Sequence, residues 1–467
     1  MKFIIKRKLS EQESSAFEIV KKLKNNKFEA YWAGGVVRDL LLDHQTHDID
    51  IATSAKPEEI SRIFPSAYDR GKSFGVMALK MGEHEYEIAS FREDIGTSDH
   101  RRPQEVKFVS AEEDASRRDI TINGLFYDPL TNEVIDYIGG LKDLENKRIR
   151  FIGEPKQRID EDYLRILRAI RFSCRLGFGI EPESFKAIEN NAEKVKQVSI
   201  ERQREELTKI LVDENRANGI NLLDKANLLK YLLPEILEQK NVPQPPEFHS
   251  EGDVWTHTLL ACKNLGDIKN LEDAEEIAWA VLLHDFGKPQ TIGRRNCEGK
   301  TKITFFEHDL KSTEMAEVIL SRFRFSHQFI NKVSWAISQH MRIVHAFRGM
   351  SERKQKQLFL DQRINILLEL THADLSASLR PDLRPEMDLY ESAVALKKRI
   401  DEETSAEEKH QVKQFDLVTG EDIMRIIGLP ASPQVGQIKE KIEKAYLEGI
   451  VNTRQDAIKE LEKLKND

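Results

Sequence analysis

The chain has 467 residues, of which 39% are hydrophobic and 33% charged, and its formal net charge is -8 at pH 7. At about 150 residues per domain this length predicts roughly three domains and excludes a peptide or disulfide-based scaffold. Cys174, Cys262 and Cys297 lie far apart without CxxC pairing, which argues against disulfides and thiolate metal sites. No stretch reaches the roughly 18 apolar residues of a membrane span, so we expect a cytoplasmic protein with no membrane partner.

The N-terminal part of the chain has a mixed helix and strand pattern. Ser10 and Glu13 form a Ser-x-x-Glu capping box, which predicts the start of a helix. Alternating hydrophobic residues predict strands over residues 28–33 and 48–53 and a hairpin over residues 76–91. This part is therefore expected to fold as α/β.

From about residue 155 the helical period of 3.6 dominates, and strand signals become rare. The segment 241–249 contains three prolines and is the best linker candidate. We predict an α+β protein with a small mixed head on an all-helical body. The expected domains are a head over residues 1–150, a helical neck over 151–240, a helical domain over 241–380 and a helical tail over 381–467.

Two glycines and two aspartates lie close together in the head. Gly34 and Gly35 fall between a predicted strand and a predicted helix, where bare backbone N–H groups can approach a phosphate. Asp48 and Asp50 lie two apart on the next strand, so both carboxylates face the same way. Such a pair suits Mg²⁺ ions that hold the attacking hydroxyl and the leaving pyrophosphate of a phosphoryl transfer. Glu87 is either a third carboxylate of this cluster or a paired surface glutamate.

The segment SRRDITINGL offers cationic groups for a triphosphate. Arg118 can bind phosphate oxygens, and Asp119 could hold the arginine in place. A solvent-facing ion pair is the alternative reading.

Charged side chains recur along the helix predicted over residues 158–172. They are Glu161, Asp162, Arg165, Arg168 and Arg171. A carboxylate that accepts beside a guanidinium that donates would pair with the edge of C or A and leave groups unpaired against U or G. A site whose buried polar groups are left unpaired by the wrong base can reject that base by a factor of about 10⁴ to 10⁵. Side chains could therefore select CTP and ATP without a template. The alternative is an amphipathic helix with internal ion pairs.

The motifs GGVVRD, DID and RRDITINGL, in this order and spacing, resemble the head domain of class II tRNA nucleotidyltransferases and bacterial poly(A) polymerases. The match covers about residues 28–210. It implies a five-stranded palm in which Asp48 and Asp50 bind Mg²⁺. The residues that it implies in nucleotide contact are Gly35, Arg38, Arg118, Arg168 and Arg171, with Asp162 and Arg165 reading the base edge.

Residues 90–106 have the polar composition of a mobile loop that could move as specificity changes from C to A. This segment resembles the family's flexible loop and ends in Arg101, Arg102 and Pro103. Residues 199–207 resemble a later family motif, for which we expect a structural or tRNA-orienting role.

A second set of candidate metal ligands lies in the helical body. It comprises His257, His284, Asp285 and Asp374, with His308 and His340 as possible further ligands. Imidazoles and carboxylates suit a divalent metal such as Mg, Mn or Ni, which can activate water for phosphoester hydrolysis. Their order resembles the HD phosphohydrolase domain and implies hydrolysis of small nucleotide esters or damaged RNA ends. The alternative is a degenerate site that only supports the fold.

Residues 322–363 contain nine Lys and Arg against two Asp and Glu, which predicts contact with RNA phosphates or, alternatively, a solvated helix face. Residues 418–451 read as helix, turn and helix, similar to the family's tRNA-supporting tail.

We therefore predict a transferase that adds C and A residues to the tRNA 3′ end from CTP and ATP, with Mg²⁺ and release of pyrophosphate. The alternatives are a poly(A) polymerase, an enzyme that adds only CC or only A, an HD-type phosphohydrolase, and an RNA-binding protein with two inactive sites. The sequence leaves the oligomeric state open.

Overall fold

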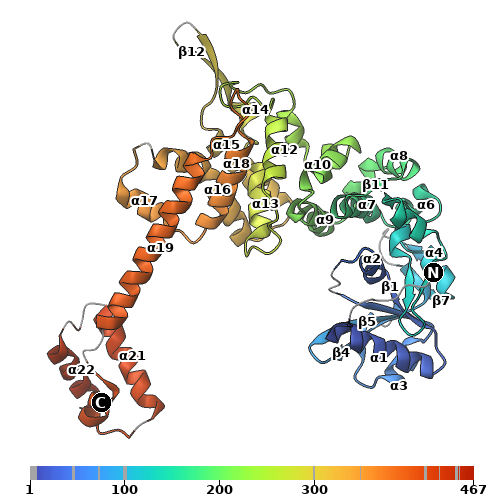
Figure 1. Ribbon diagram of the computed structural model, residues 1–467, viewed down its shortest axis with the longest axis horizontal. Helices are drawn as coiled ribbons and strands as arrows, with labels where there is room; N and C mark the ends of the chain where they lie inside the picture. Colours follow the sequence, from blue (N-terminus) through green and yellow to red (C-terminus); the bar gives the residue numbers. More distant parts are fainter. Residues whose placement is uncertain are drawn as a thin grey trace. The chain divides into compact units, whose positions relative to one another are not determined.

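The computed structural model describes residues 8–44, 48–71, 74–97, 103–297, 300–347, 349–414, 418–430, 432–447, 451 and 453–466. The chain divides into two compact units (Figure 1), one of Met1–His345 with Asn365–Met387 and the other of Ala346–Ile364 with Asp388–Asp467. Among the described residues, no helix is both long and apolar enough to cross a membrane.

The head is built on one mixed sheet with the strand order β3-β4-β5-β2-β1-β8-β9. Its strands are β1 (Ala30–Ala33), β2 (Asp50–Thr53), β3 (Tyr68–Gly71), β4 (Val76–Met81), β5 (His84–Ser90), β8 (Phe126–Asp128) and β9 (Glu133–Ile135). β2 runs antiparallel to β1 and parallel to β5. The sheet has seven strands where about five were expected, because β3 and β9 are edge strands too short to give a clear alternation.

Helix α1 (Glu11–Asn25) packs its apolar face against this sheet. The predicted capping box is confirmed, since the N–H of Glu13 donates to Ser10 Oγ and the N–H of Ser10 to Glu13 Oε2. The head core contains Ile19 with Trp32 and Ile88 of the strands. Further helices of the head are α2 (Gly35–Leu41), α3 (Pro57–Ile63), α4 (Ala111–Ser116) and α5 (Gly140–Glu145).

Part of the segment 90–106 is in strands where a loop was predicted. β6 (Arg92–Thr97) and β7 (Pro103–Phe108) pair in antiparallel fashion, and residues 98–102, which include Arg101 and Arg102, lie outside the described residues. Polar pairs such as Glu93 opposite Lys107 lie across the two strands, so they lack the apolar alternation that marks a half-buried strand.

The helical body of the first unit shares one hydrophobic core that runs from the end of the head to α18. Its helices are α6 (Pro155–Glu161), α7 (Leu164–Leu176), α8 (Pro182–Asn190), α9 (Ile200–Val212), α10 (Arg216–Lys225), α11 (Leu229–Leu232), α12 (Val254–Asn264), α13 (Ala274–Leu283), α14 (Lys288–Thr291), α15 (His308–Arg322), α16 (His327–Ala346) and α18 (Ile364–Ala377). Buried Arg216 donates to the carbonyls of Leu211 and Cys262 and so ties α9 to α12.

Two small β elements were not predicted from the sequence. β10 (Arg148–Ile149), at the end of the head, pairs in parallel with β11 (Gly179–Ile180). β12 (Ile292–Cys297) and β13 (Lys300–Phe305) form a hairpin before α15 in the body that the sequence predicts as helical. Where burial is described in β12 and β13, no side chain is buried, so these strands lack the alternation that would mark them.

The second unit is helical. It contains α17 (Glu352–Phe359), α19 (Asp388–Gln414), α20 (Gly420–Ile427), α21 (Pro433–Leu447) and α22 (Arg454–Asn466). Ile423, Ile442 and Leu461 form the centre of its own small core. The helix, turn and helix predicted over residues 418–451 correspond to α20 and α21.

Candidate active site and metal centre

A cleft with a volume of about 730 Å³ opens beside the glycine turn between β1 and α2. It is lined by all of the residues proposed from the sequence for nucleotide binding, together with the two aspartates of the DID motif. These are Gly34, Gly35, Arg38, Asp48, Asp50, Arg118, Asp119, Asp162, Arg165, Arg168 and Arg171. Motifs that are more than 130 residues apart in the chain thus meet around one cavity.

Gly34 has a backbone conformation that other residues rarely adopt, with φ at 75°. Arg118 Nη1 would lie 3.0 Å from a Cβ at this position, so the turn needs glycine both for its backbone and for the arginine beside it. The Gly34 N–H donates to the carbonyl of Leu125. This N–H is therefore not one of the phosphate donors that the sequence suggested.

Asp48 and Asp50 are exposed, while Ile49 and Ile51 are buried. β2 begins at Asp50, two residues later than predicted, but the alternation still turns both carboxylates away from the core. Partial burial, followed by the negative charge of Glu87, raises the pKa of Asp50 to about 6, although Arg118 opposes the shift. Oxygen donors with an excess of negative charge fit a divalent cation such as Mg²⁺.

Glu87 lies on β5, next to β2, but it does not line the cleft. Its Oε1 is 3.2 Å from Arg70 Nε, and the side chain is about half exposed at 46%. Glu87 is thus close enough to affect Asp50 and is also a paired surface glutamate, so both readings of the sequence have an observation behind them.

The arginine of the RRD motif is held by a different acid from the one predicted. Buried Asp114 on α4 accepts hydrogen bonds from Arg117 and Arg118. Asp119 instead binds Arg168 on α7, with 2.6 Å between Nη2 and Oδ2. Burial alone would raise the pKa of Asp119, but Arg168 outweighs it and lowers the value to about 2. Asp119 therefore holds an arginine, as expected, but one that is distant in sequence.

Arg38 lines the cleft but is only 2% exposed. Its guanidinium donates to both carboxylate oxygens of Asp39, and Nη1 donates to Asn123 Oδ1 at 2.6 Å. These bonds connect α2 to the segment that follows the RRD motif. The nucleotide contact of Arg38 implied by the resemblance stays a prediction.

The helix predicted over residues 158–172 is broken at Asp162, which has extended backbone between α6 and α7. The Asp162 side chain accepts from the N–H of Leu164, the first residue of α7. Its carboxylate faces Arg202 of α9, at 2.8 and 3.2 Å. Arg165 donates to Glu161 at 2.5 Å, so the two proposed base-reading groups are each paired with another partner.

Arg171 also contacts α9, where it donates to Glu206 at 2.5 Å. Arg202 and Glu206 were missed as site residues. The signal for them was the motif at residues 199–207, for which a structural or orienting role was expected. α9 therefore holds side chains of α7 in place at the edge of the cleft.

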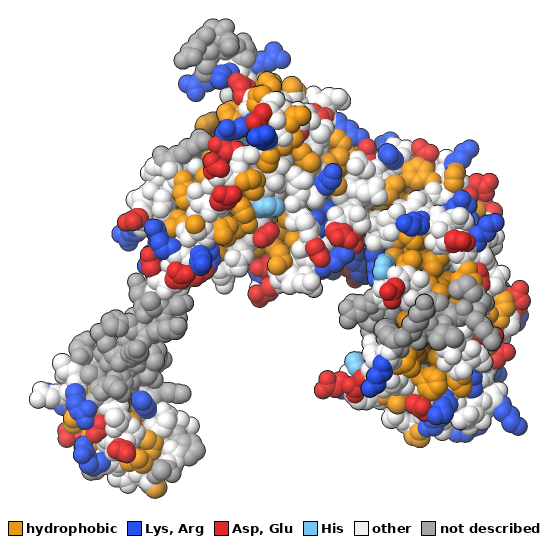
Figure 2. Space-filling model, viewed as in Figure 1, with side chains coloured by type: hydrophobic (Ala, Val, Ile, Leu, Met, Phe, Trp, Pro, Cys, Tyr) orange, Lys and Arg blue, Asp and Glu red, His pale blue; other side chains and the backbone are white. Residues whose placement is uncertain are grey.

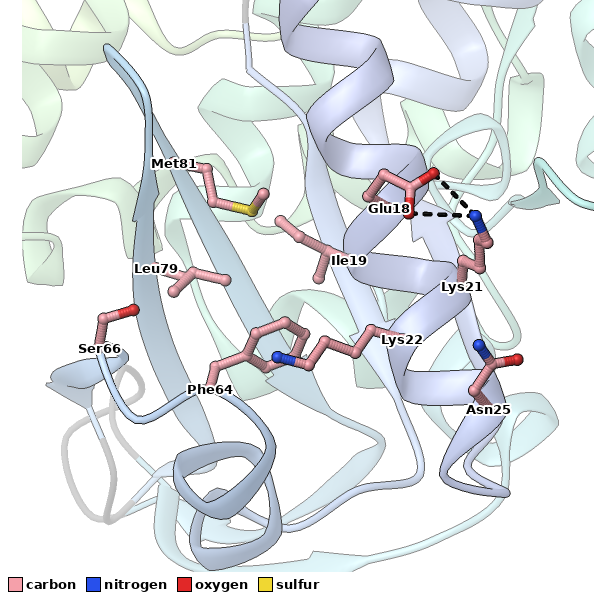
Figure 3. Close-up of a pocket in the computed structure, with 9 residues that line it drawn as sticks. All are labelled: Glu18, Ile19, Lys21, Lys22, Asn25, Phe64, Ser66, Leu79 and Met81. Carbon is pink, nitrogen blue, oxygen red and sulfur yellow. Dashed lines mark hydrogen bonds and ion pairs between the residues drawn. The ribbon is translucent and has the colours of Figure 1, made fainter.

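A second hollow of about 400 Å³ lies on the head between α1 and β4 (Figure 3). Its floor is apolar, with Phe64 and Leu79 among the lining residues. Lys21 is paired with Glu18, and Lys22 lies over the Phe64 ring. Its lining contains no arginine and a single carboxylate, so it does not resemble the first cleft chemically.

The six candidate ligands of the helical body meet at one place, brought there by four helices, α12, α15, α16 and α18, and by the turn after α13. Their metal-binding atoms form two groups, each within 4.8 Å: His257 with His284 and Asp374, and Asp285 with His308 and His340. His257 and His284 are fully buried. These residues come from separate parts of the chain, so their convergence supports a shared role.

Backbone carbonyls fix the orientation of three of these imidazoles. The Nδ1–H groups of His284, His308 and His340 donate to the carbonyls of Val281, Phe305 and Ile337. Each Nε2 therefore carries a lone pair toward the centre.

Two of these lone pairs face each other, because His308 Nε2 and His340 Nε2 are 3.2 Å apart. Burial, followed by the charges of His308 and His284, lowers the pKa of His340 to about 4, so at neutral pH the imidazole is neutral and keeps only the proton on Nδ1. Among the described residues, the buried Nε2 of His284 also has no hydrogen-bond partner, although it lies 3.2 Å from Asp285 Oδ2. A divalent metal ion fits this donor set, since it would satisfy these atoms.

Glu251, which the sequence reading missed, supports the fourth imidazole. Its Oε1 accepts from the Nδ1–H of His257 and lies 2.8 Å from His249 Nδ1. Burial would raise the pKa of Glu251, but the hydrogen bonds from His249 and His257 lower it to about 2. A carboxylate behind a ligand imidazole is a common device for orienting it toward a metal.

Several of the described basic residues in the segment 322–363 are paired with acids. Arg322 binds Glu235, Arg324 binds Glu201, and Lys332 binds Asp273. Figure 2 shows Lys and Arg side chains interspersed with Asp and Glu over the face that it draws. The positive charge counted along the sequence is therefore offset in space, and RNA contact by this segment stays a prediction.

The sequence matches three family descriptions in turn. Residues 30–150 match the poly A polymerase head domain, residues 177–240 a probable RNA and SrmB-binding site of polymerase A, and residues 254–377 the HD domain.

Curated relatives match nearly the whole chain. The CCA-adding enzyme of Streptococcus uberis is 31% identical over 443 residues, which cover 95% of this chain and 94% of the relative. That of Streptococcus mutans is 31% identical over 96% of both chains.

Solved structures have the same fold. The CCA-adding enzyme of Bacillus stearothermophilus in complex with CTP is 24% identical, with a TM-score of 0.62 over 98% of both chains. That of Thermotoga maritima, complexed with tRNA, is 22% identical with a TM-score of 0.53 and covers 98% of this chain and 96% of its own. Taken with the relatives that match nearly its whole length, these findings show that the chain belongs to the family of CCA-adding enzymes.

Proposed function

We propose that this protein adds C and A residues to the 3′ end of tRNA, with CTP and ATP as substrates and pyrophosphate as product. The observation that carries the proposal is the meeting of the DID carboxylates with the arginine cluster in one cleft. Relatives named CCA-adding enzymes over 95% of the chain favour this function over poly(A) synthesis and over partial addition. The cytoplasmic location expected from the sequence stays a prediction.

In this proposal Asp48 and Asp50 hold Mg²⁺, with Glu87 as an outer carboxylate. When bound, the ions would supply the charge that stabilises the attacking hydroxyl and the leaving pyrophosphate. Arg118 and Arg168, held by Asp114 and Asp119, bind the triphosphate oxygens.

Base selection is assigned to the break between α6 and α7. Asp162 and Arg165 have the acceptor and donor that the edges of C and A require, whereas U and G present the opposite order. To read a base, Asp162 releases Arg202 and Arg165 releases Glu161, and each then binds the nucleotide instead. Arg38 and Gly34 support the turn that shapes the cleft, and Arg171 is held ready by Glu206.

The test uses tRNA transcripts that lack CCA, end in C or end in CC, with labelled CTP or ATP and Mg²⁺. Extension of each transcript to CCA is expected, and the double variant Asp48→Ala with Asp50→Ala should abolish it. Asp43→Asn is the control, because Asp43 is exposed on the same segment and asparagine tolerates its left-handed backbone. Full activity of the double variant would contradict the proposal, and long adenylate tails on unstructured RNA would favour poly(A) synthesis.

A second activity is favoured by the convergence of the six ligands in the body. We infer that this centre is a metal-dependent phosphohydrolase for small nucleotide esters or RNA ends. His257, His284, Asp285 and Asp374, with His308 and His340, would hold the ion, and the bound ion would supply the activation of water that phosphoester hydrolysis requires. Nitrogen-rich ligands favour a transition metal such as Ni²⁺ there, with Mg²⁺ or Mn²⁺ as alternatives, whereas the oxygen ligands of the head favour Mg²⁺.

Hydrolysis of 2′,3′-cyclic nucleotides with added metal tests this activity. His284→Ala should abolish it and leave nucleotide addition unchanged. His327→Ala is the matched control, because His327 is exposed at the start of α16. Hydrolysis that persists in His284→Ala would contradict the assignment of the phosphohydrolase activity to this centre.

We also propose the predicted domains as functional parts: the nucleotidyltransferase head at 1–150, the base-reading neck at 151–240, the HD domain at 241–380 and the tRNA-supporting tail at 381–467. The three family matches fall inside the first three ranges, which supports these limits.

A further inference from the structure

A buried lysine lies beside the metal centre without being one of its ligands. Lys288, in the turn that follows the His-Asp dyad, is only 6% exposed. Its Nζ is 2.7 Å from Asp285 Oδ2 and 2.8 Å from Gln244 Oε1. The ammonium lies 5.5 Å from the centre of the Phe305 ring. An ammonium has three donors, so the two polar contacts leave one N–H for a further acceptor.

Gln244 belongs to the proline-rich segment before α12 and is 5% exposed. Because an ammonium can only donate, the amide oxygen of Gln244 must face Lys288, and the NH₂ group therefore points away from it. Within the described part of the chain, this buried Nε2 makes no hydrogen bond. Buried polar groups are nearly always hydrogen-bonded, so an acceptor is missing here.

Together, Lys288 and Gln244 offer up to three free N–H donors and one positive charge next to the metal ligand Asp285. Oxygens of a phosphoryl group are acceptors that such donors bind strongly. Among the described residues, no carboxylate or hydroxyl of the protein accepts a hydrogen bond from Gln244 Nε2. Lys288 Nζ lies 2.7 Å from Oδ2 of Asp285, so a ligand that accepts from Lys288 is adjacent to the metal centre.

We propose that Lys288 and Gln244 form a phosphoryl-binding subsite of the HD centre, which holds the phosphate of a nucleotide ester while its ester bond is hydrolysed. This inference deepens the proposed phosphohydrolase activity and rests on it. Gln244 is the donor that distinguishes the subsite from a simple ion pair between Lys288 and Asp285. The subsite accounts for the glutamine, which the predicted ligand set does not use.

Gln244→Glu is the sharpest variant, because it still accepts from Lys288 but replaces the free donors with a negative charge. With metal-loaded full-length protein, we expect the KM for a 2′,3′-cyclic nucleotide and the Kd for inorganic phosphate to rise about 10- to 100-fold. Metal content, melting temperature and tRNA nucleotide addition should not change. Gln290→Glu is the matched control, since it makes the same charge change at an exposed position of α14.

The outcomes separate the subsite from the hydrolase. Wild-type hydrolysis with unchanged KM and phosphate Kd in Gln244→Glu would overturn the subsite and leave the activity standing. Loss of metal from Gln244→Glu would also overturn it, because the residue would then act on the ion. If the wild type does not hydrolyse the ester, the proposed activity fails, and weaker phosphate binding by the variant would still support the subsite. Gln244→Met, which lacks the added charge, serves if Gln244→Glu does not fold, and should weaken phosphate binding as well.

Discussion

The head cleft and the HD centre both gather charged side chains from distant parts of the chain, but they hold them in different ways. In the cleft, Arg118 and Arg168 are held by other side chains, Asp114 and Asp119. In the HD centre, three imidazoles are fixed by backbone carbonyls. The exposed Asp50 contrasts with His284, which has no exposed surface.

This difference matches the ligands that each site is proposed to bind. The proposed transferase must admit an RNA end and then C or A, so pairs such as Asp162 with Arg202 have to exchange partners. Ion pairs between partly exposed side chains are weak enough for such exchange. A buried metal centre needs fixed lone pairs instead, because a displaced imidazole would lose its ligand role. The first site is built for replacement of partners and the second for a constant ligand set.

Metal removal should have the largest effect and tests this contrast directly. A chelator is expected to abolish both nucleotide addition and ester hydrolysis. Mg²⁺ alone should then restore addition through the oxygen donors of the head, while Ni²⁺ should restore hydrolysis more fully through the imidazoles. Both assays with measured metal content would check this. Equal recovery of hydrolysis with Mg²⁺ would show that the imidazoles do not select the ion.

Asp162→Ala tests the exchangeable pair. Addition of CMP and AMP should fall about 10²- to 10³-fold, because the variant loses the acceptor for the exocyclic amine, and discrimination against UTP should weaken. Steady-state kinetics with each of the four triphosphates would measure this. Asp160→Ala is the control, since Asp160 lies two residues before Asp162 and pairs with Lys156 and Lys194 but does not line the cleft. An equal loss in both variants would point to a structural role.

Glu251→Gln tests the fixed ligand set. The amide binds His257 Nδ1 less strongly than the carboxylate does, so metal affinity at the HD centre should fall about 10- to 100-fold. Metal titration followed by ester hydrolysis would measure this. Nucleotide addition should not change in the variant, and Glu272→Gln, at an exposed position, should affect neither activity. Unchanged metal affinity would mean that Glu251 does not orient the imidazole.

The sequence predicts which residues meet better than it predicts how they are held. The DID pair and the His-Asp dyad follow from strand alternation and from the order of ligand types, and both are where they were expected. The partners of the arginines do not follow from local pattern, since Asp119 binds an arginine 49 positions away. The helix break at Asp162 accompanies a local bond from the N–H of Leu164 to the Asp162 side chain, which competes with a strong helical pattern. Glu251 was missed because it lies in the segment before α12 and nothing in the local pattern marks it. Lys288 lies only three residues after Asp285, so it could have been considered together with the dyad.

The smallest predicted effect concerns Gly287, between the dyad and Lys288. A Cβ at this position would lie 2.6 Å from the carbonyl oxygen of His308 and from the backbone nitrogen of Ser312. Gly287→Ala should therefore push α15 away from the turn, at a cost of about 1 to 3 kcal/mol in the free energy of unfolding. Because His308 moves with α15, metal affinity should fall with stability, whereas the glycine turn of the head is unaffected. Thermal melting with and without metal would measure both, and Gly436→Ala, at an open position of α21, should leave metal affinity unchanged. A loss of stability with full metal affinity would mean that the metal centre tolerates movement of a ligand helix, contrary to the contrast drawn with the head.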